Sequence, residues 1–172
     1  MDLLPKTGLY SHDVTAYLLA AEELDIQPNQ EFLSILVEAK PECSLDGVDD
    51  INLEAISKIL KVNAFIKKLR FTNGTFTVVG LTHLADALGG NETITEIDLS
   101  DFALGDAGAK IIGDQIGIKE LTGGGCRSLQ SLNVSGCGLG PAGLEALCRG
   151  LGGLPGSARV LRAERNHLPP QA

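Results

Sequence analysis

Residues 129–143 read LQSLNVSGCGLGPAG, a short apolar pattern that runs into glycines and a proline. The same spacing of apolar residues occurs at residues 66–71 (IKKLRF) and at residues 94–99 (ITEIDL). Each copy has another apolar residue five positions on (Phe76, Leu104 or Leu139) and then enters a helix-like stretch. A unit of about 28 residues cannot bury its own apolar face, so copies must stack on one another. The period therefore predicts an α/β solenoid of alternating short strands and helices.

The period also divides the chain. We expect repeats at residues 38–172, with units at 38–65, 66–93, 94–128, 129–157 and a partial unit at 158–172. The unit 94–128 carries an insertion with Gly123–Gly125, which we interpret as a surface loop. The unit 38–65 is interpreted as a degenerate repeat whose strand has eroded around Pro41 and Cys43. The last unit ends at Pro169-Pro170, which leaves open a capped end, a truncated array or a partner at that end.

The helices have their own start signals. Asp106 is expected to cap the helix that follows Leu104, or to favour its dipole. Residues 11–25 and 30–39 predict two helices, and we interpret residues 1–37 as an α-helical N-terminal cap over the first repeat. Residues 1–65 hold 12 acidic and 4 basic residues, whereas the remainder holds 10 of each. The acidity therefore belongs to the N-terminal part.

Composition excludes several classes of function. The net charge of −8 argues against nucleic acid and against an anionic membrane as the main partner. No apolar stretch approaches the ~18 residues of a membrane helix. The four cysteines have no metal-ligand spacing, and we expect them to be reduced, intracellular and mostly buried. No cysteine or serine has the neighbours of an activated nucleophile, and we expect no enzyme, no cofactor and no metal.

The pattern Leu129-x-x-Leu132-x-Val134-x-x-Cys137-x-Leu139-Gly140-Pro141-x-Gly143 resembles a leucine-rich repeat. The unit length and the Gly-Asp-x-Gly of residues 105–108 are similar to the ribonuclease-inhibitor subtype, and the resemblance covers residues 38–170. It implies short parallel strands on a concave face and helices on a convex face. The position that the family fills with Asn or Cys holds Cys137 and Asn166, but Gly74 and Phe102 elsewhere. The ladder that these side chains form with the backbone would be interrupted there.

The strands would leave one polar face free. Its candidate protein-binding residues are Lys67, Lys68, Arg70, Glu96, Asp98, Asp101, Gln130, Asn133, Arg159 and Arg162, joined by Thr72, Asn73, Thr95, Ser100, Ser131, Ser135, Glu164 and Arg165. We expect Lys67 or Lys68 to pair with Glu96, and Arg70 with Asp98, across adjacent strands. These residues are either a solvated face that ties repeats together or a docking surface for a protein. A divalent cation at Glu96, Asp98 and Asp101 is a minor alternative, because an all-protein Ca²⁺ site needs six to eight oxygens.

The resulting interpretation is a non-enzymatic module that binds another protein. We expect a scaffold or adaptor in the cytoplasm, associated with the cytoskeleton, the centrosome or the cilium. The N-terminal segment is weakly similar to segments of centrosomal and ciliary leucine-rich repeat proteins. Two alternatives stay open: a regulator of an enzyme, as a GTPase activator or nuclease inhibitor, and a protein that binds actin-filament ends. Arg127 is the candidate finger residue of a GTPase activator.

Overall fold

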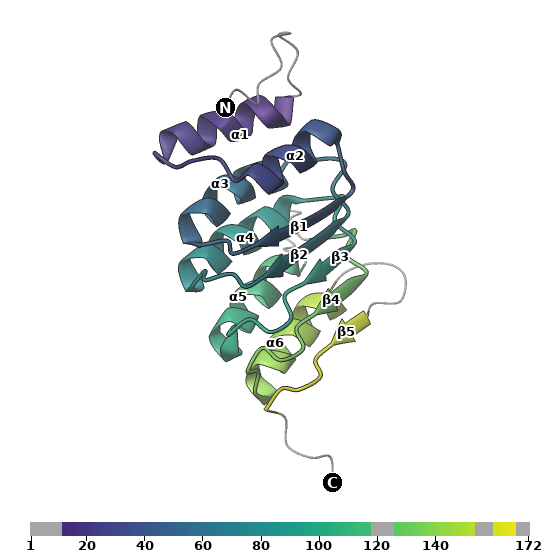
Figure 1. Ribbon diagram of the computed structural model, residues 1–172. Coiled ribbons are helices and arrows are strands. Elements are labelled where there is room, and N and C mark those ends of the chain that lie inside the picture. Colours follow the sequence, from purple (N-terminus) through teal and green to yellow (C-terminus); the bar gives the residue numbers. More distant parts are fainter. Residues whose placement is uncertain (1–11, 118–125, 154–159, 168–172) are drawn as a thin grey trace.

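The computed structural model describes residues 12–117, 126–153 and 160–167. Its helices are α1 (His12–Glu23), α2 (Gln30–Glu38), α3 (Asp50–Leu60), α4 (Val78–Gly90), α5 (Gly105–Ile116) and α6 (Pro141–Gly152). Its strands are β1 (Glu42–Asp46), β2 (Lys68–Thr72), β3 (Glu96–Asp98), β4 (Ser131–Asn133) and β5 (Val160–Arg162). From β1 onward, strands and helices alternate along the chain (Figure 1).

The strands form one parallel sheet in chain order, β1-β2-β3-β4-β5, and helices α3–α6 form a second layer behind it (Figure 1). Leu69 pairs with Ile97, Ile97 with Leu132, and Leu132 with Leu161. These register steps equal the repeat spacings of 28, 35 and 29 residues read from the sequence. The expectation that residues 67–71, 95–99 and 130–134 contain side-by-side parallel strands is confirmed.

The core lies between the sheet and the helices and is almost wholly aliphatic. The middle residue of each short strand points inward, so Ile97 and Leu132 are buried. Each following helix adds residues from its inner face, for example Leu84, Ile112 and Leu147. Burial of such side chains contributes about 1.5–3 kcal/mol each relative to exposure. The apolar spacing of the sequence is thus the spacing of the core.

The prediction of an eroded first strand is wrong. β1 is five residues long and pairs with β2 along its whole length, from Glu42↔Lys68 to Asp46↔Thr72. Pro41 precedes the strand, where its missing N–H is not needed, and its carbonyl accepts hydrogen bonds from the amides of Lys67 and Lys68 at 2.8 and 3.0 Å. Cys43 and Leu45 supply the buried positions. The offset between β1 and β2 is shorter than 28 residues because residues 47–49 connect strand to helix more tightly than residues 73–77 do.

Helices α1 and α2 lie at the β1 end of the molecule, where α1 packs on α3 and α2 packs on β1 (Figure 1). The rings of Tyr17 and Phe32 meet edge to face at 4.8 Å, and the Tyr17 hydroxyl accepts a hydrogen bond from the Asn29 amide at 2.8 Å. The Asn63 side chain donates to Asp13 Oδ2 at 2.6 Å, which joins α1 to the turn after α3. The role of residues 1–37 as a cap stays a prediction.

Aspartates link one helix to the next. Asp106 lies in the first turn of α5, but its Oδ1 accepts from the amides of Gly140 and Gly143, at 2.7 and 2.9 Å, at the start of α6. Asp50 of α3 likewise accepts from the amides of Thr77 and Gly80 at the start of α4. Of the two roles expected of Asp106, capping of its own helix is wrong, because its side chain satisfies free N–H groups of the following helix. Its place in the first turn of α5 agrees with the alternative, a favourable interaction with the helix dipole.

Two buried asparagines hold the turns between helix and strand. Asn63 and Asn91 lie 28 residues apart and are both almost completely buried. The Asn91 side chain donates to the Leu60 carbonyl at 2.6 Å and accepts from the Thr93 and Ile94 amides, each at 2.8 Å. Asn63 accepts from the Phe65 and Ile66 amides in the same way. Sequence reasoning missed this role, although the separation of the two asparagines equals the length of one repeat.

Candidate functional site

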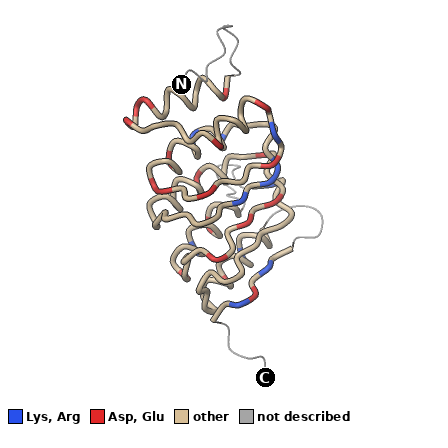
Figure 2. Tube along the Cα trace, viewed as in Figure 1, with Lys and Arg blue, Asp and Glu red and all other residues tan. Residues whose placement is uncertain are grey.

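The candidate site is the exposed face of the parallel sheet, which we call the sheet face. Because strand side chains alternate, the residues on either side of each buried position point away from the helices. Register places them in two rows: Glu42–Lys68–Glu96–Ser131, and Ser44–Arg70–Asp98–Asn133–Arg162. The tube in Figure 2 shows basic and acidic positions alternating from strand to strand along this side.

Charges on the sheet face are paired across strands. Lys68 Nζ lies 3.3 Å from Glu42 Oε1 and 3.8 Å from Glu96 Oε2, so one ammonium group joins three strands. The hydrogen bond to Glu42 and the charge of Glu96 raise the pKa of Lys68. Arg70 Nε lies 3.7 Å from Asp98 Oδ2. The expected pairs Lys68–Glu96 and Arg70–Asp98 are confirmed. Since the groups are largely exposed, solvent and salt screen these pairs.

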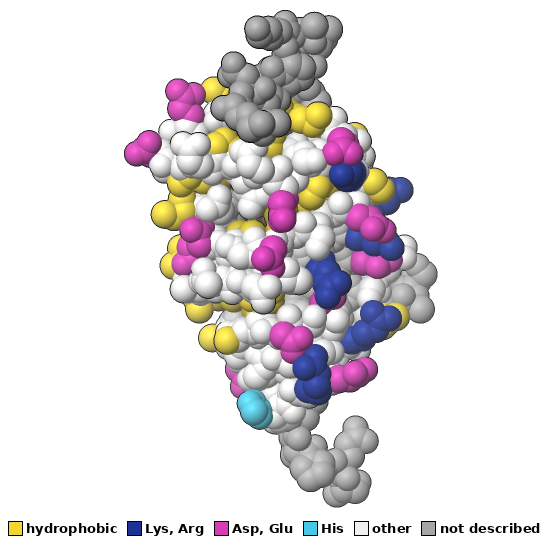
Figure 3. Space-filling model, in the orientation of Figure 1, with side chains coloured by type: hydrophobic (Ala, Val, Ile, Leu, Met, Phe, Trp, Pro, Cys, Tyr) yellow, Lys and Arg dark blue, Asp and Glu magenta, His cyan; other side chains and the backbone are white. Residues whose placement is uncertain are grey.

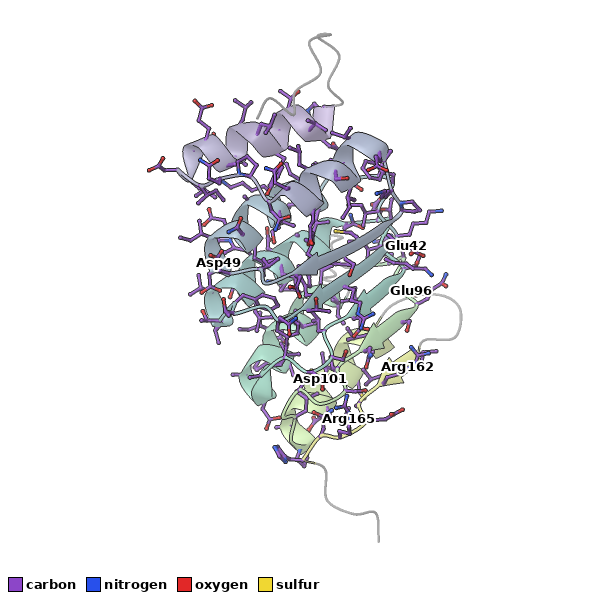
Figure 4. All side chains as sticks on the ribbon, viewed as in Figure 1. Glu42, Asp49, Glu96, Asp101, Arg162 and Arg165 are labelled. Atoms are coloured by element: carbon purple, nitrogen blue, oxygen red, sulfur yellow. The ribbon has the colours of Figure 1, made fainter. Side chains whose placement is uncertain are left out.

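The remaining candidate residues fall in different places. Lys67, Gln130 and Arg162 are exposed, and Asn133 is half-buried. Arg159 lies outside the described residues. Asp101 follows β3 in a left-handed conformation (φ +65°) and pairs with Arg165 at 2.9 Å, beyond the carboxyl ends of the strands (Figure 4).

The expected position of Ser135 is wrong. It was expected on the sheet face, but it is buried, and its Oγ accepts a hydrogen bond from the Glu164 amide at 3.2 Å. The cause is that β4 ends at Asn133, so strand alternation no longer holds two residues later. Its backbone carbonyl also accepts from the Asp101 amide at 2.8 Å. Ser135 thus ties three layers together and is not available to a partner.

The middle of the sheet face is a shallow groove of about 270 Å³, which we call the sheet groove. Its lining mixes both signs of charge with polar side chains, including Glu42, Lys68, Arg70, Asp98 and Arg162 (Figure 4). Within the described ranges, no three His, Cys, Asp or Glu side chains gather as metal ligands would. Of the carboxylates considered for a cation, Glu96 instead faces Lys68, and Asp98 and Asp101 face arginines. The groove therefore offers charge and hydrogen-bond recognition over an extended strip.

The structure contains a second hollow, which the sequence did not predict. It lies where β2 and β3 turn toward α4 and α5, has a volume of about 480 Å³, and is called the edge pocket here. Its lining includes Phe71, Phe76 and Phe102 with polar groups of Arg70 and Asn73 at its rim. The available signal was the departure from the repeat pattern at Gly74 and Phe102.

The cysteines and Arg127 lie away from the two hollows or are buried beneath them. No disulfide joins the four cysteines, all of which lie in the described parts of the chain; Cys43, Cys126 and Cys137 are buried, and Cys148 is exposed. Burial raises the pKa of Cys43 to about 12 and that of Cys137 to about 11. Arg127 is exposed just before β4. Among the parts of the chain described, no helix has both the length and the hydrophobicity needed to cross a bilayer.

Comparison with known families identifies one element of this architecture. A leucine-rich repeat family model matches residues 125–148, which hold β4 and the first part of α6. No curated protein matches the chain. The matched segment pairs in parallel with β3 before it and β5 after it, so it is one layer of the whole sheet. The match and the parallel α/β architecture together support a leucine-rich repeat protein.

Proposed function

We propose that this chain is a protein-binding module and that its partner docks on the sheet face. The observation that carries the proposal is the continuous register of outward-facing polar residues across β1–β5, from Glu42 to Arg162, which are charged on every strand except β4. Leucine-rich repeats are a family of protein-binding modules, and the helices leave this face uncovered (Figure 1). Lys and Arg side chains lie beside acidic ones over it (Figure 3).

The charge arrangement supports selective docking. Lys68 lies between two carboxylates, and Arg70 pairs with one. The surface therefore has little net charge of its own. A mixed surface rejects partners that bring like charges together, and this gives specificity more than affinity. Arg162 has no ion-pair partner among the residues that the structure describes, so it is a cation open to a partner's carboxylate.

The finer assignments are part of the proposal. We infer a solenoid of the ribonuclease-inhibitor-like subtype with units bounded as above, and residues 1–37 as its cap. We propose a scaffold or adaptor role in the cytoplasm, on the cytoskeleton, the centrosome or the cilium. Enzyme regulation and actin-end binding are the competing roles. A GTPase assay with Arg127→Ala and co-sedimentation with actin filaments test them.

The direct test is a charge reversal with a matched control. Partners captured from cell extract by the full chain are identified, purified and titrated against Lys68→Glu. The control is Lys61→Glu, because Lys61 lies on the helix side and pairs with Asp86, and both lysine side chains are 49% exposed. We expect Lys68→Glu to weaken binding by about tenfold or more and Lys61→Glu to leave it unchanged. Equal affinity of the two variants contradicts docking on the sheet face.

A further inference from the structure

The edge pocket has the size and lining of a binding subsite. Its volume of about 480 Å³ lies within the ~300–1,000 Å³ typical of ligand pockets. The apolar part of its lining is contributed by Phe71, Phe76, Leu81, Phe102 and Leu104. Phe76 is only partly buried, although Phe71 and Phe102 on either side of it are buried. An apolar ring is therefore left facing the hollow.

The pocket occurs where the repeat pattern fails. In the β4 and β5 layers, Cys137 donates through its thiol to the Leu99 carbonyl, and Asn166 donates to the Val134 carbonyl. The equivalent position in the β2 layer is Gly74, which has no side chain. A Cβ at Gly74 would lie 2.7 Å from Phe102 Cε1, so the ring of Phe102 occupies that space. There it stacks on Phe76 with ring centroids 4.5 Å apart. An aromatic stack thus replaces the polar ladder at this layer.

Arg70 joins the pocket to the sheet face, because it lines both the edge pocket and the sheet groove. Its side chain is 60% exposed, whereas that of Asp98 is 30% exposed. Asp98 Oδ1 also accepts from the Ser100 amide at 3.0 Å. The closest approach of the ion pair is through Arg70 Nε, and the two terminal nitrogens of the guanidinium form no hydrogen bond with another described residue. Those nitrogens can bind a carboxylate in a bidentate arrangement.

The surface next to the pocket is apolar. Val78 and Val79 open α4, two and three residues after Phe76, and they are 50% and 59% exposed. Hydrophobic side chains reach the surface along the same edge of the molecule, the edge that carries Asp49 (Figures 3 and 4). The other charged group at the rim, Asp101, is neutralised by Arg165 at 2.9 Å. A contact that combines apolar groups with one accessible cation fits an apolar residue beside an acidic one.

We propose that the edge pocket anchors an extended segment of the partner protein, taking a large apolar or aromatic side chain while Arg70 binds a carboxylate on a neighbouring residue. The inference rests on the proposed function and names the partner's chemistry. The segment lies along the sheet groove and turns its anchor residue into the pocket at the end of β2 and β3. Buried aromatic anchors of this kind commonly carry much of an interface's affinity.

The probe is a random linear peptide library displayed on phage and selected on the full chain. We expect enriched peptides to place Phe, Trp, Leu or Met beside Asp or Glu. A synthetic peptide of the enriched sequence is then titrated against Ala103→Trp, which fills the pocket from its rim, and against Ala107→Trp. Both alanines are exposed, but only Ala103 lines the pocket, so the second variant is a matched control.

We expect Ala103→Trp to weaken binding by about tenfold or more and Ala107→Trp to change it less than about twofold. Arg70→Gln should weaken the acidic peptide but not its amide counterpart. As a check independent of any variant, the aromatic NMR signals of Phe76 and Phe102 should shift when the peptide is added to the unaltered chain. Equal binding of the two tryptophan variants, no enrichment, or unmoved Phe76 and Phe102 signals overturns the inference. If Lys68→Glu abolishes partner binding while Ala103→Trp does not, docking on the sheet face is supported and the role of the edge pocket is refuted.

Discussion

Replacing Asn91 by alanine should cause a large loss of stability, because its side chain is the hydrogen-bond partner of several backbone groups. The Leu60 carbonyl and the Ile94 amide are both buried and bond to the Asn91 side chain at 2.6 and 2.8 Å. The Thr93 amide, at 2.8 Å, is only part-buried and can reach water. Each buried group left unpaired costs about 1–3 kcal/mol, so two cost about 2–6 kcal/mol.

That loss is large against the ~5–15 kcal/mol by which folded domains are stable. Urea unfolding followed by circular dichroism measures it, and with an m-value of about 2 kcal/mol per M a loss of this size lowers the midpoint by about 1–3 M. The matched control is Asn133→Ala, since Asn133 is half-buried and its side chain accepts from the Ser135 amide at 3.1 Å. We expect that variant to lose about 1 kcal/mol or less. Equal losses in the two variants would refute the role assigned to the buried turn asparagine.

Four further predictions concern other parts of the chain. Asp106→Ala should destabilise by about 0.5–2 kcal/mol and raise hydrogen exchange at the start of α6 rather than of α5. Alkylation of the native protein should modify Cys148 and spare Cys43, whose thiol is buried; rapid labelling of Cys43 contradicts the fold of β1. Hydrogen bonds from Thr72 and Asn73 lower the pKa of Asp46, so the stabilisation that they give is present at neutral pH and lost as pH falls through that lowered pKa. Acidification should therefore cost the natural chain more stability than Asp46→Asn, as measured by urea midpoints across pH. Deletion of residues 1–37 should cause aggregation or uncooperative unfolding, and a soluble, cooperative remnant argues against a cap.

Much of the fold could be predicted because the core repeats with the sequence. Leu69, Ile97 and Leu132 recur at the spacing that later becomes the register of β2, β3 and β4. Strand alternation then places Lys68, Arg70, Glu96 and Asp98 on one face, and the pairs between them follow from register alone. A local rule therefore suffices wherever each unit resembles its neighbour.

The failures concern features that the apolar period does not describe: contacts from one unit to the next, and the ends of the strands. Asp106 lies where a self-cap is expected, yet its partners belong to α6, and the offset between adjacent helices is set by packing. Ser135 follows the end of its strand, so the two-residue period no longer applies. β1 was missed because polar residues around Cys43 hide a strand that only its pairing with β2 defines.

The departure from the repeat pattern at Gly74 and Phe102 differs from these failures, because the sequence did reveal it. It was visible in the sequence as a break in the polar ladder, and the structure places stacked rings and a hollow there. Packing alone would favour closing such a hollow, because an exposed apolar ring gains nothing from water. The later layers hold Cys137 and Asn166 at the equivalent position. A residue of either type at Gly74 would fill the hollow. Conflicts between local pattern and global fold are expected at functional sites. We therefore propose that the edge pocket, more than the regular part of the sheet face, determines which partner binds.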